Sequence, residues 1–291
     1  MPLRDIALAL GVVLVWGVNF VAIKWGVDEV PPFLLTALRY LGCALPAVFF
    51  IRPPKVGWPL LVAYGMTVGV LQFGFLFTAM RLGMPAGLAS LVMQMQVFIT
   101  MALAISLLGD RPAPVQLGGA AVALIGLGTI AAEHVGGAVL VPLLLTLVAA
   151  GFWAVSNIIT KRAGQIDMLA FVVWGSLVPP LPMLALSLVF EGPQALTGLL
   201  SISPRAIFSI LFIAYGSTLV GYGAWAVLLG RHKASLIAPF SLLVPVVGFA
   251  AAFVFLGEQV SLLEIAGSLL IFGGLVLNAF GPRLLARWRV A

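Results

Sequence analysis

We predict from the sequence an all-α integral membrane protein of ten transmembrane helices, built as two inverted five-helix repeats around a central cavity. The first observation is composition, since 63% of the 291 residues are apolar and 8% are charged. Soluble domains are about half apolar and about a quarter charged, so this composition excludes a soluble globular protein and a disordered one. The second observation is that the apolar residues lie in long runs, and the third is that the two halves of the chain are similar.

The apolar runs divide into ten stretches, each near the length of about 20 residues that a transmembrane helix needs. Glycine or proline marks most of the breaks between them. The first stretch is predicted to be a retained helix and not a cleaved signal peptide, because no small-x-small site precedes Asp28. The ten predicted spans are residues 6–26, 33–51, 58–80, 86–108, 113–132, 139–160, 168–190, 206–229, 234–256 and 261–281.

The basic residues lie mainly between the apolar runs, and the net charge is +6. In a soluble protein this charge suggests nucleic acid, but here the positions indicate orientation in a lipid bilayer and no nucleic-acid partner. With the N-terminus in the cytoplasm, eleven of the 15 Lys and Arg residues fall at inner ends, which predicts that both termini are cytoplasmic. The inner residues are Arg4, Arg52, Lys55, Arg111, Lys161, Arg162, Arg231, Lys233, Arg283, Arg287 and Arg289, and the outer ones are Lys24, Arg39, Arg81 and Arg205.

Two pairs of similar segments relate the halves of the chain. Residues 16–24 resemble residues 153–161, both running from Trp to Lys, and residues 107–110 resemble residues 255–258. Because each half holds five predicted spans, an odd number, the halves must enter the membrane in opposite senses. Inverted repeats are typical of secondary transporters, which bind their cargo between the halves. The predicted repeats are residues 1–135, with the first five spans, and residues 136–291, with the last five.

Several short segments carry a family resemblance, namely residues 15–20 (VWGVNF), 38–41 (LRYL), 85–98 (PAGLASLVMQMQVF), 108–112 (LGDRP), 221–225 (GYGAW) and 242–248 (LLVPVVG). With them the chain resembles the drug/metabolite transporter superfamily, specifically its EamA-type ten-helix exporters. The segment 85–98 is similar to exporters of the cysteine/O-acetylserine type and of the aromatic amino-acid (YddG-like) type. Asp110 departs from the family pattern, which more often has Glu there, and we expect the effect to be mild.

The resemblance implies a multi-pass protein of the bacterial inner membrane that exports amino acids and related small metabolites by alternating access. The implied substrates are neutral amino acids, including aromatic, Met, Thr and Cys types. No Asp or Glu lies near the middle of a predicted span, and both histidines fall in loops. Because proton-coupled carriers usually place a titratable group in the pathway, we predict facilitated efflux down the substrate gradient, or weak coupling to protons.

Polar side chains inside the predicted spans are few and fall in clusters. They predict a cavity with aromatic walls and a few amide and hydroxyl groups, a combination that suits a zwitterionic amino acid. The alternative is that the amides and hydroxyls join helices and that Trp and Tyr form interfacial belts, which is favoured for Trp225. Of Gln94 and Gln96, two positions apart, only one is expected to face the cavity. The predicted pathway residues are Trp16, Asn19, Gln72, Phe75, Ser90, Gln94, Gln96, Trp153, Asn157, Thr218, Tyr222 and Ser241.

Lysine, proline and glycine suggest further roles. Lys24 and Lys161 either hold a substrate carboxylate at each mouth or extend to lipid headgroups. Pro179 and Pro180 are expected to kink the seventh span, as a gating hinge or as a static bend. Glycines in the fifth and tenth spans indicate a packing or dimer surface in a monomer or homodimer. These glycines are Gly118, Gly119, Gly126, Gly267, Gly273 and Gly274.

Other classes of function are disfavoured because the sequence lacks the motifs that they need. There is no HExxH motif, no P-loop and no close acid pair within a span, so an enzyme, a metal site and a cofactor are not expected. A carrier of sugar phosphates or nucleotides needs several interior cations, and none is predicted beyond the end-placed Lys24, Arg39 and Lys161. A broad drug exporter driven by proton exchange is the main alternative function, and a membrane scaffold protein is the third class considered.

Overall fold

The computed structural model describes residues 1–134, 137–164, 166–232 and 237–288, and every regular element in these ranges is helical. Lys233 and Arg289, two of the predicted inner cations, lie outside the described residues. The described helices include eight that are long and apolar enough to cross a membrane, so the chain is a multi-pass membrane protein. These are Leu3–Glu29, Trp58–Arg81, Ala86–Leu108, Pro114–Glu133, Leu140–Ala163, Met168–Glu191, Pro204–Leu228 and Leu262–Pro282.

Two shorter apolar helices, Pro32–Ala47 and Phe240–Leu256, lie in the second and ninth predicted spans. Each of the ten predicted stretches therefore contains a helix, and the prediction of an all-helical membrane protein is confirmed. A helix that crosses the hydrocarbon core needs about 17 residues or more. The count of ten crossing helices therefore stays a prediction.

Several spans are composites of shorter helices. In the first half they are α1 (Leu3–Glu29), α2 (Pro32–Ala47), α3 (Trp58–Gly65), η1 (Met66–Gln72), α4 (Phe73–Arg81), α5 (Ala86–Val92), η2 (Met93–Met95), α6 (Gln96–Leu108) and α7 (Pro114–Glu133). In the second half they are α8 (Leu140–Ala163), α9 (Met168–Gly175), α10 (Pro180–Leu186), η3 (Ser187–Glu191), α11 (Gln194–Gly198), η4 (Leu199–Ser201), α12 (Pro204–Leu211), η5 (Phe212–Val220), α13 (Gly221–Arg231), η6 (Ala238–Leu243), α15 (Val244–Leu256) and α16 (Leu262–Trp288).

The two halves share departures from regular α-helix at matching places. The third and eighth spans contain the π-helical segments η1 and η5, and the fourth and ninth contain the 3₁₀ segments η2 and η6. The helices α6 and α15 both end at a left-handed glycine, Gly109 with φ 70° and Gly257 with φ 66°. A positive φ is adopted readily only by glycine, which explains the residue type at both ends. The similarity of the halves therefore extends from sequence to backbone, while their opposite insertion stays a prediction.

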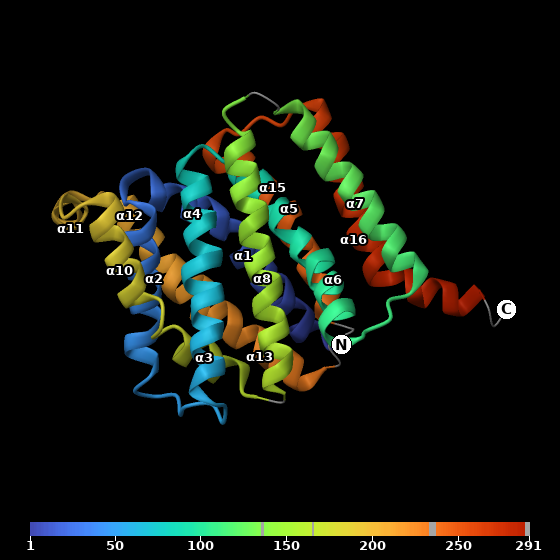
Figure 1. Ribbon diagram of the computed structural model, residues 1–291, viewed down its shortest axis with the longest axis horizontal. Coiled ribbons are helices and arrows are strands. Elements are labelled where there is room, and N and C mark those ends of the chain that lie inside the picture. Colours follow the sequence, from blue (N-terminus) through green and yellow to red (C-terminus); the bar gives the residue numbers. More distant parts are fainter. Residues whose placement is uncertain (135–136, 165, 233–236, 289–291) are drawn as a thin grey trace.

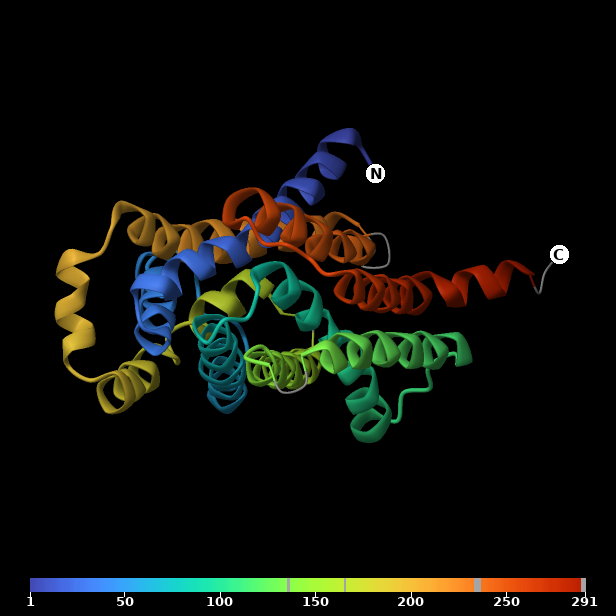
Figure 2. The same ribbon diagram turned by 90° about the horizontal axis from the view of Figure 1, so that it is seen from above.

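The fifth and tenth spans, α7 and α16, lie side by side at one edge of the molecule, opposite α11 (Figures 1 and 2). A Cβ built on Gly126 would lie 2.5 Å from the carbonyl oxygen of Gly267. These glycines therefore let the two backbones touch, which confirms the predicted packing role. Gly119 and Gly274 meet in the same way, whereas Gly118 and Gly273 face open space, and the dimer alternative stays untested.

The seventh span is interrupted where two prolines were predicted to bend it. Helix α9 ends at Gly175 and α10 begins at Pro180, since proline cannot donate the backbone hydrogen bond that would continue the helix. The Pro179 ring packs on Gly69, where a Cβ would overlap the ring atoms. The break in the seventh span thus packs against Gly69 of the third span. Its role as a hinge stays a prediction.

Candidate functional site

A cavity of about 500 Å³ lies between the two halves of the chain. Its walls come from α1, α2, α4, α5 and η2 of the first half and from α8, α13 and η6 of the second, among others. A volume of this size is in the range of about 300–1,000 Å³ that is usual for small-molecule sites. Nine of the twelve predicted pathway residues line it: Trp16, Asn19, Gln72, Ser90, Gln94, Gln96, Trp153, Tyr222 and Ser241.

The other three predicted pathway residues are not among the residues that line the cavity. Phe75 stacks on Phe152 with the ring centroids 5.8 Å apart. The Asn157 side-chain nitrogen donates to the Gln96 side-chain oxygen over 2.7 Å, so it positions a residue that does line the cavity. Thr218 accepts a hydrogen bond from Arg39 over 3.3 Å and donates to the Ile213 carbonyl. In this conformation Asn157 and Thr218 each contact a lining residue, and Phe75 contacts a ring outside the lining.

Both Gln94 and Gln96 line the cavity, which corrects the expectation that only one would do so. The cause is the 3₁₀ segment η2, in which each residue turns by about 120° instead of about 100°. Two residues that are two positions apart then point about 120° from each other, against about 160° in an α-helix. Gln94 also donates to the Ser241 carbonyl over 3.2 Å, which ties the fourth span to the ninth.

Aromatic side chains form one wall of the cavity. The Trp16 ring lies 5.4 Å from the Tyr222 ring and 5.1 Å from the Trp225 ring, measured between centroids. Trp225 lines the cavity, so it is not a lipid-facing belt residue as predicted. The Trp16 indole nitrogen donates to the Ser217 carbonyl over 3.1 Å, within the π-helical segment η5. The wall is therefore held to the eighth span by ring contacts and by a hydrogen bond.

Three polar side chains in the wall carry buried atoms without partners. In the described part of the chain the side-chain oxygens of Asn19 and Gln72 have no hydrogen-bond donor, and Arg39 has two unpaired nitrogens. Buried polar groups without partners are uncommon, because desolvation costs them free energy. Two acceptor groups and one cation are thus present beside a cavity that a polar ligand would enter.

Arg39 is the functional candidate that the sequence interpretation missed. It was placed at the outer end of the second span, but it lies in the middle of α2, is 2% exposed and lines the cavity. The predicted span of 33–51 extends beyond the helix, which ends at Ala47, and this shifted the apparent centre away from Arg39. The interior therefore does contain a cation, contrary to that expectation.

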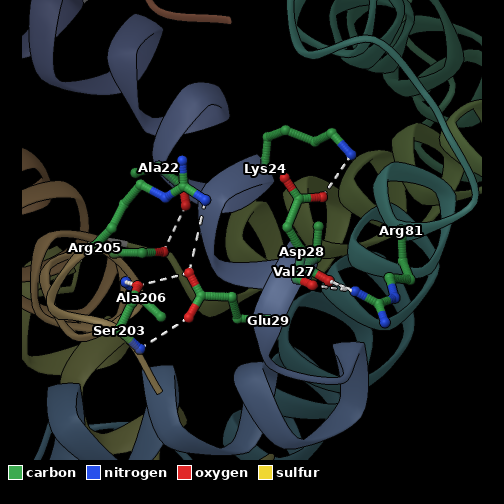
Figure 3. Close-up of polar contacts among 10 residues, drawn as sticks. Ala22, Lys24, Val27, Asp28, Glu29, Arg81, Ser203, Arg205 and Ala206 are labelled. Carbon is green, nitrogen blue, oxygen red and sulfur yellow. Dashed lines mark hydrogen bonds and ion pairs between the residues drawn. The ribbon is translucent and has the colours of Figure 1, made fainter. Parts of the chain in front are cut away.

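Near the end of α1 the two halves are joined by polar contacts (Figure 3). The Glu29 carboxylate accepts hydrogen bonds from the Ser203 backbone nitrogen over 2.9 Å and from the Ser203 hydroxyl over 2.6 Å. Arg205 lies 3.7 Å from the same carboxylate. Arg81 donates to the carbonyls of Val27 and Asp28, so the start of α12 and the end of α4 are both fastened to α1.

Two more carboxylates join the halves at this end, each at the start of a helix. Glu258 accepts from the backbone nitrogens of Ala86 and Gly87 over 2.6 and 3.0 Å. Glu191 accepts from the backbone nitrogens at the start of α2 over 2.7 and 3.1 Å. Free N–H groups and the helix dipole both favour a carboxylate there. The sequence interpretation assigned these acids no role, because a helix start in the other half cannot be identified from local sequence.

The cavity extends toward the opposite end of the molecule. Thr160 in the last turn of α8 and Met168 at the start of α9 both line it. Lys161 beside them is exposed and pairs with Asp110 over 2.7 Å. Lys24 lies at the end where Glu29, Glu191 and Glu258 join the halves, called the fastened end from here on, and it pairs with Asp28 over 2.7 Å. Neither predicted mouth lysine is in the cavity lining. Their proposed contact with substrate stays a prediction.

Comparisons with known proteins found a family and relatives that match almost the whole chain. The model of the EamA-like transporter family matches residues 3–132 and 140–280. A "Probable amino-acid metabolite efflux pump" of Salmonella typhimurium is 45% identical over 301 aligned residues and covers 100% of both chains. A protein of the same name from Escherichia coli is 42% identical and covers 100% of this chain and 98% of its own length.

More distant relatives and one solved structure also match along most of the chain. A "Probable terminal-alkyne amino-acid exporter" of Streptantibioticus cattleyicolor is 28% identical, with coverage of 98% of this chain and 95% of its own. A solved structure described only as "Crystal structure of protein" superposes with a TM-score of 0.64 and 20% identity. It covers 94% of this chain and 95% of its own length. This last likeness supports the fold alone.

Proposed function

The chain belongs to the EamA-like transporter family, and from that premise we propose that it exports neutral amino acids and related small metabolites by facilitated alternating access. The observation that carries the proposal is the cavity between the halves, whose wall contains aromatic rings and unpaired amide oxygens. Amide oxygens and aromatic faces both attract an ammonium group, and aromatic faces also accept apolar side chains. The names of three relatives refer to amino-acid export, which supports the same substrate class.

Alternating access is supported by the unequal ends of the cavity. Glu29, Glu191 and Glu258 fasten the halves at one end, while Thr160 and Met168 extend the cavity toward the other. In the proposed cycle the three carboxylates release the helix starts and the cavity then opens at their end. With cytoplasmic termini, as proposed from the Lys and Arg distribution, the fastened end faces the outside of the cell. In the conformation described, the cavity then extends toward the cytoplasm.

Facilitated transport is supported by the chemistry of the cavity wall. Among the described residues that line the cavity there is no Asp, Glu or His. Efflux down a substrate gradient needs no proton-binding group, whereas a proton-exchange carrier requires one in or near the pathway. We place the protein in the inner membrane of a bacterium, as a monomer or homodimer.

The experiment is transport by the purified protein in liposomes. Labelled threonine, phenylalanine, methionine and cysteine are each measured with and without an imposed pH gradient, beside a cationic dye. We expect saturable amino-acid flux whose rate does not depend on the pH gradient. Dye flux alone, driven by protons, would replace the proposal with the broad drug exporter, and steeply pH-dependent amino-acid flux would overturn the facilitated mechanism only.

A further inference from the structure

Arg39 lies between the large cavity and a void of about 10 Å³ that is lined in part by Tyr40 and Thr218. Its guanidinium carbon is 3.7 Å from the centre of the Phe73 ring, and its Nη2 donates to the Thr218 hydroxyl over 3.3 Å. Its Nε and Nη1 have no hydrogen-bond partner. Among the described residues no carboxylate lies within 4.0 Å of it, so this buried cation has no counter-ion in the protein.

A guanidinium remains charged in proteins, and burying an unpaired charge is costly. The Phe73 face offsets part of this cost through a cation–π contact and orients the guanidinium plane. The hydrogen bond to Thr218 is long for an N–H···O contact, so it holds the group weakly. Carboxylates are strong partners for a guanidinium, because its donors match their two oxygens.

We propose that Arg39 is the anchor for the carboxylate of the transported molecule. The inference rests on the proposed function and narrows it, since the site then requires a free carboxylate. The unpaired oxygens of Asn19 and Gln72 are in the wall of the same cavity and accept the ammonium group of the substrate. The cavity thus selects zwitterionic α-amino acids over amines and esters that have the same side chain.

The first test compares phenylalanine with phenylalanine methyl ester and phenethylamine, which lack the free carboxylate. Arg39→Gln is measured beside wild type, with Arg52→Gln as the matched control on an exposed loop residue. We expect Arg39→Gln to raise the KM for phenylalanine about tenfold or more and to leave that for phenethylamine unchanged. Arg52→Gln is expected to change neither KM more than about twofold. A KM for phenylalanine that Arg39→Gln leaves within about twofold of wild type overturns the anchor.

The second test measures binding without transport. The carboxylate 3-phenylpropionate is titrated against the purified protein in nanodiscs, and tryptophan fluorescence is recorded because Trp16 and Trp225 line the cavity. We expect saturable quenching in wild type and its loss in Arg39→Gln. Wild-type protein that transports no amino acid but binds 3-phenylpropionate through Arg39 refutes the proposed function and retains the anchor. Amino-acid transport with unchanged 3-phenylpropionate binding in Arg39→Gln refutes the anchor and retains the function.

A wild-type comparison decides the case in which Arg39→Gln does not fold. Phenylalanine methyl ester and phenethylamine are tested as inhibitors of labelled phenylalanine uptake by the unmodified protein. The anchor predicts that both inhibit about tenfold or more weakly than unlabelled phenylalanine does. If the ester reaches half-maximal inhibition at the same concentration as unlabelled phenylalanine, the anchor role of Arg39 is wrong.

Discussion

Asn19 lies one turn after Trp16 on α1, and both side chains line the cavity. They differ in how their polar atoms are satisfied. The Trp16 nitrogen donates to the Ser217 carbonyl, whereas the Asn19 oxygen is buried without a donor. Trp16 therefore fixes the wall, and Asn19 has an acceptor available for a ligand.

The substitution Asn19→Leu tests this assignment, because leucine keeps a similar volume and removes the acceptor. A hydrogen bond to a charged group contributes roughly 1.5–3 kcal/mol, so the KM for phenylalanine is expected to rise about tenfold or more. Asn278→Leu is the matched control, since Asn278 contacts Met101 and does not line the cavity. Transport kinetics in liposomes give both values. Equal KM values for Asn19→Leu and wild type would remove Asn19 from the pathway.

At the scale of helices, the fastened end depends on carboxylates that meet helix starts across the two halves. The helix starts of α2, α5 and α12 each receive one carboxylate, from Glu191, Glu258 and Glu29. Such contacts can be broken and remade without disturbing the helices, because each helix keeps its own backbone ladder. They are suited to a gate more than to permanent packing such as that of α7 on α16.

If these contacts act as a gate, Glu258→Ala is expected to open the fastened end more often, because it removes the acceptor for the backbone nitrogens of Ala86 and Gly87. The measurement is the labelling rate of Ser90→Cys in a Cys43→Ser background, using a membrane-impermeant maleimide on intact cells. Ser90 lines the cavity and is 1% exposed, so its labelling reports opening. We expect faster labelling with Glu258→Ala and no change with Glu133→Ala, whose carboxylate contacts Ser261 in the turn before α16. Equal rates in both variants would show that Glu258 does not hold the gate.

The sequence predicts the helices well and their internal irregularities poorly. Residues 86–108 were predicted as the fourth span, and the helical segment is Ala86–Leu108, because span length follows directly from the apolar run. The 3₁₀ segment η2 inside it could not be predicted, since a helix that is apolar on every side has no stripe from which to measure a period. For the same reason the sequence did not predict that Gln94 and Gln96 both line the cavity. Arg39 was missed because the end of α2 at Ala47 is not marked in its apolar sequence.

At the scale of the whole molecule, both halves match the family model, and the third and eighth spans share a π-helical segment as the fourth and ninth share a 3₁₀ segment. The cavity lies where the halves meet, so its lining depends on residues more than 100 positions apart, as between Gln94 and Ser241. A repeat of this kind explains why the predicted pathway residues fall in both halves. Whether the halves are inserted in opposite senses depends on whether the short helix α2 crosses the membrane.

Two cysteine substitutions decide this question. In a Cys43→Ser background, Lys55→Cys and Glu133→Cys place single thiols at exposed positions after α2 and at the end of α7. If α2 crosses and the N-terminus is cytoplasmic, three further crossings lie between the two positions, so Lys55→Cys is inside and Glu133→Cys is outside. An impermeant maleimide on intact bacteria is then expected to label only Glu133→Cys, and both thiols are labelled after permeabilisation. Leu3→Cys, at an 82% exposed position at the start of α1, is the reference and must be labelled only after permeabilisation, which places the N-terminus in the cytoplasm. If it is so placed and α2 does not cross, the pattern of the other two thiols reverses. The first half then holds four spans, and the inverted arrangement is wrong even though the fold and the family remain.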